Sequence, residues 1–173
     1  MQIRPATQAD LKAVAALEAC CFPPAEAADA ETLAARLAAF PDHFLLGWEG
    51  DTLVGFIDGM TTDTPDLEDE MYADAALHNR GGAWQMVFGL EVHPAYRRQG
   101  RAAALMQALI DQARAEGRRG VVLTCKAEKI AYYQKFGFVN EGVSGSVHGG
   151  VTWYQTVSYT QLRAHETAAN LVC

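Results

Sequence analysis

An apolar strand that runs into a basic, glycine-containing loop and then into an amphipathic helix is the feature that most constrains this chain. Residues 84–92 predict the strand, and residues 99–116 predict a helix whose apolar side chains recur three and four positions apart. The loop between them carries three arginines and a glycine within residues 97–101. Because the free N–H groups at a helix start carry partial positive charge, this order of elements predicts a site for an anion such as a pyrophosphate. A solvated loop that merely precedes a helix is the alternative interpretation.

The length and charge of the chain limit the classes of protein to which it can belong. Its 173 residues are 50% hydrophobic and 20% charged, as expected for a single globular domain. The formal net charge of -7 argues against a nucleic-acid-binding protein, which needs clustered Lys and Arg, and favours cationic partners such as amines. No apolar run reaches the roughly 18 residues that span a bilayer, and residues 1–10 show no leader pattern. We therefore expect a cytoplasmic monomer or homodimer that binds neither nucleic acid nor membrane.

The four cysteines indicate reduced thiols rather than a disulfide framework or a metal site. Cys20 and Cys21 are adjacent, whereas Cys125 and Cys173 are isolated, and no spacing matches a zinc motif. Cys125 lies in an apolar stretch, where the role of a buried small hydrophobe is commoner than that of a nucleophile. We therefore give no cysteine a catalytic role and expect no metal.

Apolar periodicity and turn residues elsewhere predict an alternation of strands and helices. A tight turn at Gly50-Asp51 joins two apolar runs into an antiparallel hairpin. A polar, acidic excursion over residues 61–82 follows, and long ordered loops of this kind are often functional. The alternation predicts an α/β or α+β domain with a mixed sheet. The expected strands cover residues 3–7, 43–49, 52–60, 84–92, 120–125, 137–146 and 150–157, and the expected helices cover residues 7–21, 26–40, 99–116 and 128–135.

Several segments together carry a family resemblance. They resemble the GNAT superfamily of acyl-CoA-dependent N-acyltransferases, over about residues 1–157. The carrying segments are the strand end Leu90-Glu-Val92, the loop Arg97-x-x-Gly100-x-Ala102 and, downstream, Tyr132-Tyr133-Gln-Lys-Phe136-Gly137-Phe138. Three further segments are similar to the serotonin (arylalkylamine) N-acetyltransferase branch: Cys21-Phe22-Pro23, Trp84-Gln-Met-Val-Phe-Gly-Leu90 and Leu123-Thr-Cys-Lys126.

The resemblance implies a fold and a domain boundary. The fold would be an α/β (α+β) GNAT fold, with a mixed, mostly antiparallel sheet of about seven strands flanked by about four helices. One N-acetyltransferase domain would cover residues 1–157. Residues 158–173 show no match to the family, and we expect them to form a non-native or disordered tail, with a native helical extension as the alternative.

The resemblance also implies a reaction and its cosubstrate. Acetyl would pass from acetyl-CoA to a primary amine, such as an arylalkylamine or a polyamine, by direct attack and without a metal. The main chain at the splayed edge of the fourth strand would pair with the pantetheine arm, and the loop and helix start would hold the pyrophosphate. The residues in these cofactor-binding roles are Leu90, Glu91, Val92, Arg97, Arg98, Gln99, Gly100, Arg101, Ala102 and Ala103.

Tyr133 matches the tyrosine that acts as the acid in this family. It would protonate the departing thiolate, and a phenol of ordinary pKa about 10 suits a leaving group of similar basicity. The alternative is that Tyr132 and Tyr133 both pack beneath the turn at residues 136–138. The motif favours a catalytic Tyr133 and a core Tyr132.

The proton acceptor is the point at which this sequence departs from the branch. Two histidines on the fourth strand of that branch are linked to deprotonation of the amine, and Met86 and Phe88 stand at the matching positions. Neither accepts a proton, although an alkyl ammonium of pKa about 10.4 must lose one before it attacks. His148, in a small polar loop between the last two strands, is our candidate for catalysis, with an ordinary surface histidine as the alternative. Weaker candidates are Glu91, Asp69, Glu70 and His78.

The absence of the paired histidines keeps a second class of function open. A catalytically silent acyl-CoA-binding sensor or interaction module would bind the cosubstrate without turning it over. The identity of the amine does not follow from the sequence.

Overall fold

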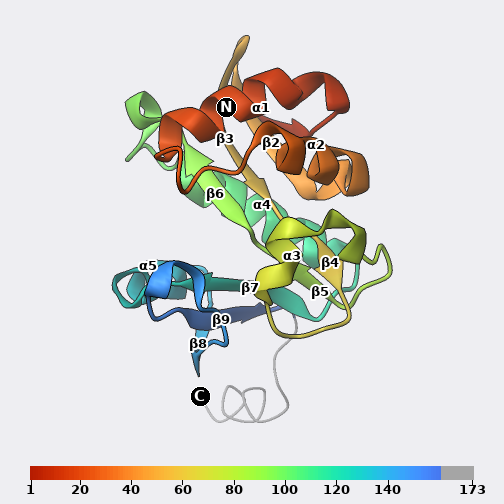
Figure 1. Ribbon diagram of the computed structural model, residues 1–173, viewed down its shortest axis with the longest axis vertical. Coiled ribbons are helices and arrows are strands. Elements are labelled where there is room, and N and C mark those ends of the chain that lie inside the picture. The colour runs from red at the N-terminus through yellow and green to blue at the C-terminus, as the bar shows by residue number, and fades with distance from the viewer. Residues whose placement is uncertain (161–173) are drawn as a thin grey trace, which may run out of the picture.

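The computed structural model describes residues 1–160 and contains an upper and a lower sheet (Figure 1). The first sheet is antiparallel with the order β1-β2-β3-β6, and the second has the order β4-β5-β7-β9-β8, in which only β5 and β7 are parallel. The strands of the first sheet are β1 Gln2–Pro5, β2 Phe44–Glu49, β3 Thr52–Asp58 and β6 Gly89–Val92. Those of the second are β4 Thr61–Thr62, β5 Trp84–Met86, β7 Gly120–Cys125, β8 Val139–Val143 and β9 Tyr154–Tyr159.

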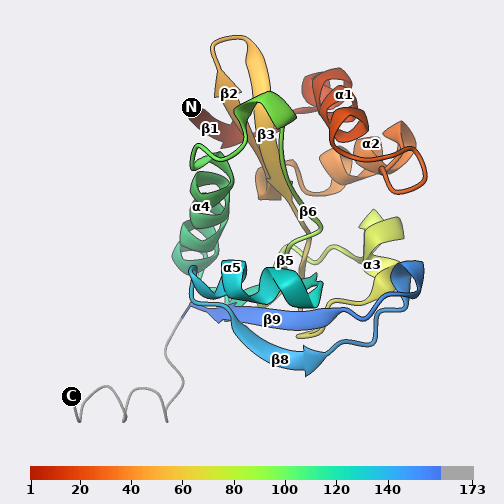
Figure 2. The same cartoon turned by 90° about the vertical axis from the view of Figure 1, so that its left-hand side faces the viewer.

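Helices cover both faces of the first sheet. α1 (Leu11–Cys21) and α2 (Ala30–Ala39) lie on one side of it, and α4 (Arg101–Ala115) lies on the other (Figure 2). The short helices α3 (Asp69–Ala73) and α5 (Ile130–Gln134) flank the second sheet. Single 3-10 turns occur at Gln8–Asp10, Pro41–His43, Ala75–Leu77, Pro94–Tyr96, Ala127–Lys129 and His148–Gly150.

Each side of the sheets has its own apolar core. Val14 and Phe56 belong to the cluster beneath α1 and α2, and Leu105 belongs to the cluster beneath α4. Side chains of β7 alternate between the two, with Val121 in the second cluster and Val122 in the first, as strand geometry requires. Among residues 1–160, no helix is long and apolar enough to cross a membrane.

The predicted fold class is confirmed, and several strands differ from expectation in their bounds. The expected strand over residues 52–60 ends at Asp58 and a separate strand, β4, follows it, whereas the expected strand over residues 84–92 is divided into β5 and β6. The last strand continues to Tyr159, two residues past the expected end of the domain, and Ser158 is buried in it. Residues 158 and 159 therefore belong to the sheet, and the rest of the predicted tail, beyond residue 160, lies outside the described residues.

Capping side chains explain where the 3-10 turn before α1 and the helix α2 begin. Asp10 accepts from the backbone N–H of Thr7 at 2.8 Å, which completes the capping box expected at this position. Asp29 accepts from the N–H of Thr32 at 2.8 Å, so α2 begins at Ala30 and not at residue 26 as the sequence predicts. An Asp at the N-cap stabilises a helix by about 1 kcal/mol because it bonds an N–H that would otherwise lack a partner.

Gly59 and Gln85 accommodate the interruption of the two long strands. At Gly59, between β3 and β4, a Cβ atom would lie 1.8 Å from the carbonyl oxygen of Met86, so no other residue fits there. The buried amide nitrogen of Gln85 donates to the backbone carbonyls of Gly59 (2.9 Å), Met60 (3.3 Å) and Met86 (2.8 Å). An unpaired buried carbonyl costs about 1–3 kcal/mol, and this single side chain removes that cost at the interruption.

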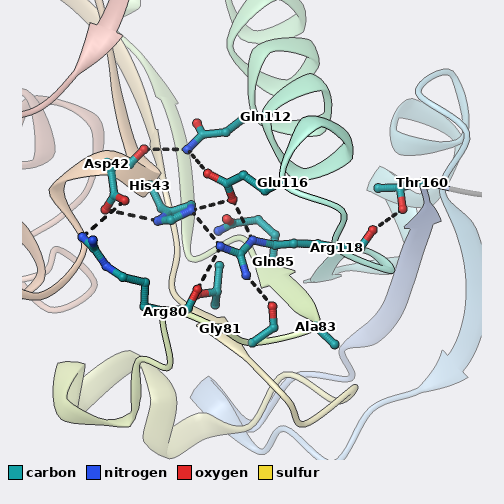
Figure 3. A network of polar contacts seen from close by, with 12 residues as sticks. Asp42, His43, Arg80, Gly81, Ala83, Gln85, Gln112, Glu116, Arg118 and Thr160 are labelled. Atoms are coloured by element: carbon teal, nitrogen blue, oxygen red, sulfur yellow. Dashed lines mark hydrogen bonds and ion pairs between the residues drawn. The ribbon is translucent and has the colours of Figure 1, made fainter.

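A network of charged groups connects the two sheets (Figure 3). Arg118, just after α4, donates from Nε to Glu116 (2.8 Å) and from its terminal nitrogens to the carbonyls of Arg80 (3.2 Å) and Gly82. Glu116 also lies 2.9 Å from Nε2 of the buried His43. Burial alone would raise the pKa of Glu116, but its bonding partners hold the pKa below its ordinary value. The network thus joins the end of α4 to the start of β2 and to the segment before β5.

Candidate functional site

The two sheets separate between β6 and β7. β5 pairs with β7 as far as Met86 and Val122, whereas β6 pairs only with β3 within residues 1–160. The edges of β6 and of the later part of β7 therefore diverge. We call the point at which they separate the apex, and there the N–H of Val87 donates to the carbonyl of Val122 (2.9 Å). Backbone groups along such open edges can pair with an extended ligand.

Leu90 presents its backbone to this opening. The N–H of His93 donates to the carbonyl of Val54 at 2.8 Å, which marks that pair as hydrogen-bonded. Hydrogen-bonded and non-hydrogen-bonded residue pairs alternate along two antiparallel strands. Val92 opposite Gly55 and Leu90 opposite Ile57 are therefore non-hydrogen-bonded pairs. The N–H and C=O groups of Leu90 and Val92 thus point away from β3. The carbonyl of Val92 accepts from Nε of Arg97 (2.9 Å). Leu90 is therefore the β6 residue best placed to bond a ligand through its main chain.

The start of α4, which follows the far end of β6, is shaped for an anion. Gly100 is the N-cap in a left-handed conformation (φ 81°), and no side chain caps the helix. Arg98 also has a positive φ (61°), which is uncommon for a residue with a side chain. The N–H of Ala104 closes the first helical bond, so the N–H groups of residues 101–103 have no partner within the helix. A Cβ atom at Gly100 would meet nothing within 4 Å, which leaves open space at this helix start.

The three arginines of the loop have different roles. Arg97 donates to the backbone carbonyl at the end of β6, as described above. Arg101 pairs with Glu49 and lies over the ring of Tyr96, its guanidinium carbon 5.1 Å from the centroid. The side chain of Arg98 is exposed. Two of the arginines that the sequence placed at the anion site thus brace the loop, and Arg98 directs its charge toward solvent.

Tyr133 lies on α5 and packs into the cluster beneath α4. Its ring centroid is 5.8 Å from that of Phe138 and 5.2 Å from that of Tyr132. Burial raises the pKa of its hydroxyl to about 12, with smaller contributions in the same direction from Cys125 and Tyr132. The phenol therefore carries its proton at neutral pH. The two roles weighed for Tyr133 are compatible, because the ring packs in the core while the hydroxyl stays in the form that an acid needs.

Glu91 lies on the opposite face of β6, beneath α1. It is 5% exposed and faces Glu18 and Asp58, whereas Arg36 pairs with Asp58 at 3.1 Å. Burial, then the hydrogen bond and charge of Glu18, raises the pKa of Glu91 well above its ordinary value. A carboxyl group that keeps its proton at neutral pH is not a general base, which argues against Glu91 as the proton acceptor.

We expect Glu91→Gln to reduce the alkaline sensitivity of the fold. The folded protein binds this proton more tightly than the unfolded chain, whose carboxyl has a pKa of 4.5, so stability is lost as pH rises above that value. The amide has no proton to lose. Urea unfolding at about pH 5 and about pH 9 should show a smaller loss of stability in the variant than in the wild type. The exposed Glu26→Gln is the control, and equal losses in Glu91→Gln and wild type would show that folded Glu91 is ionised.

His148 lies in an exposed loop, and Asp69 at the start of α3 holds that loop in place. The carboxylate of Asp69 accepts from Oγ of Ser146 (2.6 Å) and from the N–H of Val147 (3.1 Å), and these bonds lower the pKa of Asp69. The ring of His148 lies 6.3 Å from that of Trp153, centroid to centroid. The structure therefore brings two predicted candidates, Asp69 and His148, to the same loop cluster.

An acidic hollow adjoins this loop cluster. Its volume is about 660 Å³, and it lies between residues 66–70, which lead into α3, and the β8–β9 hairpin. The carboxylates in its lining come from Asp66, Glu68, Asp69, Glu70 and Glu141. A hollow lined by carboxylates concentrates cations such as ammonium groups near the hairpin.

The other predicted candidates lie elsewhere. Nδ1 of His78 accepts from the N–H of Thr61 at 3.1 Å, its ring lies 5.9 Å from that of His43, and burial lowers its pKa. His78 therefore belongs to the region of the charged network rather than to the opening. Met86 is fully buried, whereas Phe88 stays partly exposed at the apex. Of the two residues at the positions of the paired histidines, Phe88 is thus the one that borders the opening.

Two residues that the sequence did not single out, Tyr72 and Arg36, meet Phe88 and Thr124 at the apex. The hydroxyl of Tyr72 lies 3.3 Å from Oγ1 of Thr124, and the Tyr72 ring lies 4.9 Å from that of Phe88. Arg36 donates to the backbone carbonyl of Tyr72 at 2.9 Å. No motif marks Tyr72 or Arg36, because their meeting with Thr124 depends on the path of residues 61–82 across the second sheet.

An open strand edge that leads to an uncapped helix start is an arrangement suited to an extended ligand with an anionic end. The sequence matches the model of the Acetyltransferase (GNAT) family over residues 11–138, so the chain belongs to this family. Serotonin N-acetyltransferase of Mesocricetus auratus is 31% identical over 132 residues, which cover 71% of this chain and 61% of that protein. The chain thus spans about three fifths of the length of the curated relatives it matches. Both levels of the resemblance seen in the sequence are confirmed.

Solved structures agree with the family at the level of the fold. The loading GNATL domain of CurA from Lyngbya majuscula has a TM-score of 0.81 at 17% identity, with 94% of this chain and 98% of that chain covered. The GphF GNAT-like decarboxylase in complex with isobutyryl-CoA has a TM-score of 0.78 at 20% identity, with 93% and 100% covered. At these identities the likeness establishes the architecture and leaves the reaction to be argued from the site.

Proposed function

We propose that this protein transfers an acetyl group from acetyl-CoA to a primary amine by direct attack. The observation that carries the proposal is the path from the apex along Leu90 to the uncapped start of α4. A thioester at the apex, an extended arm along β6 and a pyrophosphate at the helix start match that path in order. The similarity to serotonin N-acetyltransferase and to a structure that holds isobutyryl-CoA supports it.

Binding of the cosubstrate falls mainly on main-chain groups. The C=O of Leu90 would pair with an amide of the pantetheine arm, and Glu91 and Val92 would continue the strand beyond that contact. The N–H groups of residues 98–103 would bind the pyrophosphate, because the helix dipole favours negative charge there. Arg98 adds an exposed cation at this position.

Tyr133 would act as the general acid of the transfer. The neutral amine attacks the thioester carbon, and negative charge grows first on the thioester oxygen, where the main-chain N–H of Leu90, which faces the opening, stabilises it. As the C–S bond breaks, the charge passes to sulfur and the Tyr133 hydroxyl donates its proton there, while the nitrogen that attacked loses one proton to water and becomes the amide nitrogen. Burial keeps the Tyr133 hydroxyl protonated at neutral pH but makes it a weaker acid than an ordinary phenol. The transfer to sulfur therefore requires a thiolate that is itself desolvated and so more basic than in water.

The acidic hollow and His148 would serve the amine. Carboxylates in the hollow attract a protonated amine, and the exposed imidazole accepts its proton directly or through water. This arrangement supplies an acceptor that does not depend on the histidines replaced by Met86 and Phe88.

A screen of acceptors tests the proposed function. Consumption of acetyl-CoA is followed with arylalkylamines, polyamines, amino acids and peptide N-termini, and coenzyme A binding is measured separately by calorimetry. Faster thiol release with a primary amine than without one supports the proposal. Binding without turnover of any acceptor would support the silent acyl-CoA-binding module instead, and absence of binding would reject both.

Gly100→Glu tests the anion site. Its side chain would enter the open space at the helix start and repel a pyrophosphate, so the Kd for coenzyme A should rise at least about tenfold. Gly100→Asn is the control, because Asn tolerates a left-handed conformation and adds no charge. Circular dichroism checks that both variants fold. An unchanged Kd in folded Gly100→Glu would place the pyrophosphate elsewhere.

A further inference from the structure

An acyl chain that follows the opening to the apex can turn toward either of two faces. On the face beneath α4 and α5 the space is filled by Val87, Leu123 and Cys125, each at most 6% exposed. On the face toward α3, Phe88 and Thr124 are both partly exposed. An acyl group longer than acetyl therefore meets packed core on one face and an accessible surface only on the other.

Tyr72 covers that accessible face. Its hydroxyl lies 3.3 Å from Oγ1 of Thr124 on β7, and its ring lies 4.9 Å from the ring of Phe88, which leads into β6. One side chain from α3 thus bridges the two strands that diverge at the apex. Burial is the main cause that raises the pKa of the Tyr72 hydroxyl, so the hydroxyl stays neutral and able to bond Thr124.

Arg36 holds this bridge from behind. Its guanidinium donates to the backbone carbonyl of Tyr72 at 2.9 Å and lies 4.8 Å over the ring of Phe88. The same group pairs with the fully buried Asp58 at 3.1 Å, and Arg36 itself is only 7% exposed. Displacing Tyr72 therefore disturbs a packed ring, a hydroxyl contact and a buried cation together.

We propose that Tyr72 is a specificity-determining residue that restricts the acyl group to a short chain such as acetyl. The inference rests on the proposed function, since it places the thioester at the apex. An acetyl methyl group ends before the bridge of Tyr72 and Thr124, whereas a butyryl chain must displace the Tyr72 ring. The substrate class excluded by this residue is that of acyl-CoA thioesters with longer aliphatic chains.

Truncation of Tyr72 tests the proposal through a ratio. For Tyr72→Ala, kcat/KM is measured with acetyl-CoA and with butyryl-CoA at a fixed amine, and the butyryl to acetyl ratio should rise at least about tenfold, as single-methylene discrimination suggests. Tyr72→Phe keeps the ring and loses only the hydroxyl contact, so its ratio should rise less. Tyr72→Leu is a second truncation that retains apolar packing if the Ala variant does not fold. Tyr159→Ala is the matched control. Tyr159 is the last residue of β9, whereas Thr124 pairs with Gln155 near the start of that strand.

The outcomes separate this inference from the proposed function. A raised ratio in the truncated variants, with the Tyr159→Ala ratio unchanged, supports the role of Tyr72. Ratios equal to that of the wild type in folded Tyr72→Ala and Tyr72→Leu overturn it, even where acetyl transfer itself persists. If no acyl-CoA is turned over, the proposed function fails, and binding then decides the inference. The affinity for butyryl-CoA relative to that for acetyl-CoA should rise in Tyr72→Ala and Tyr72→Leu, and an unchanged relative affinity overturns the role of Tyr72.

Discussion

Tyr133→Phe is expected to slow turnover by roughly 10² to 10⁴, with the Kd for coenzyme A nearly unchanged. The substitution removes one hydroxyl and leaves the ring that packs against Phe138, so it separates the acid from the core residue. Single-turnover rates and calorimetry measure the two effects. Tyr132→Phe, one position away and in ring contact with Tyr133, is the matched control and should retain activity. Full activity in Tyr133→Phe would reject the proposed acid while leaving the binding site intact.

The alkaline side of the rate profile supplies a second readout for Tyr133. The protonated phenol is the active form, and its pKa is raised to about 12, so activity governed by this group is kept at neutral pH and lost only as pH approaches that value. A phenol with the ordinary pKa of about 10 would cause the loss about two pH units lower. A profile of kcat that stays flat to about pH 11 in the wild type would agree with the buried phenol.

Arg118→Met should destabilise the protein by about 3 kcal/mol, the largest effect on stability that we expect. Methionine preserves much of the side-chain volume but leaves the carbonyls of Arg80 and Gly82 and the carboxylate of Glu116 without the cation that bonds them (Figure 3). The bond to the Gly82 carbonyl is buried and those to Arg80 and Glu116 are partly buried, so the Gly82 carbonyl carries the largest cost when its partner is lost. Urea unfolding measures the change.

Arg114→Met is the control for this effect. Arg114 lies in the last turn of α4, four residues before Arg118, and pairs with Asp111, but the side chains of Arg114 and Asp111 are both more than half exposed. Surface pairs of this kind contribute about 0–1 kcal/mol because water solvates both charges. Similar losses in the two variants would mean that the charged network contributes no more than a surface pair does.

Local signals explain what could be predicted. The turn at Gly50-Asp51, the capping box at residues 7–10 and the loop at residues 97–101 depend on side chains within a few positions of one another, and the structure contains all three. The motif around Tyr133 is equally compact. Predictions based on such neighbours are accurate because backbone conformation and short-range hydrogen bonds decide them.

Long-range contacts explain what could not be predicted. Gln85 reads as an ordinary polar residue in a strand, yet its amide bonds three carbonyls, two of them on another segment. Tyr72 and Thr124 are separated by 52 positions and meet only because the excursion crosses the second sheet. The burial of Glu91 against Glu18 likewise follows from the packing of α1 on β6, and no local pattern reveals it.

The sequence by itself determined the family, the order of the elements, the helix start at which we propose an anion and the identity of the candidate acid, since each depends on residues that are neighbours in the chain. Only the tertiary structure decided where the strands separate, which arginines brace the loop, which carboxyl keeps its proton and which aromatic side chain covers the apex. These properties depend on burial and on contacts between distant segments. Burial changes the cost of a charge and the space left for a ligand, and the order of residues alone does not encode either quantity locally.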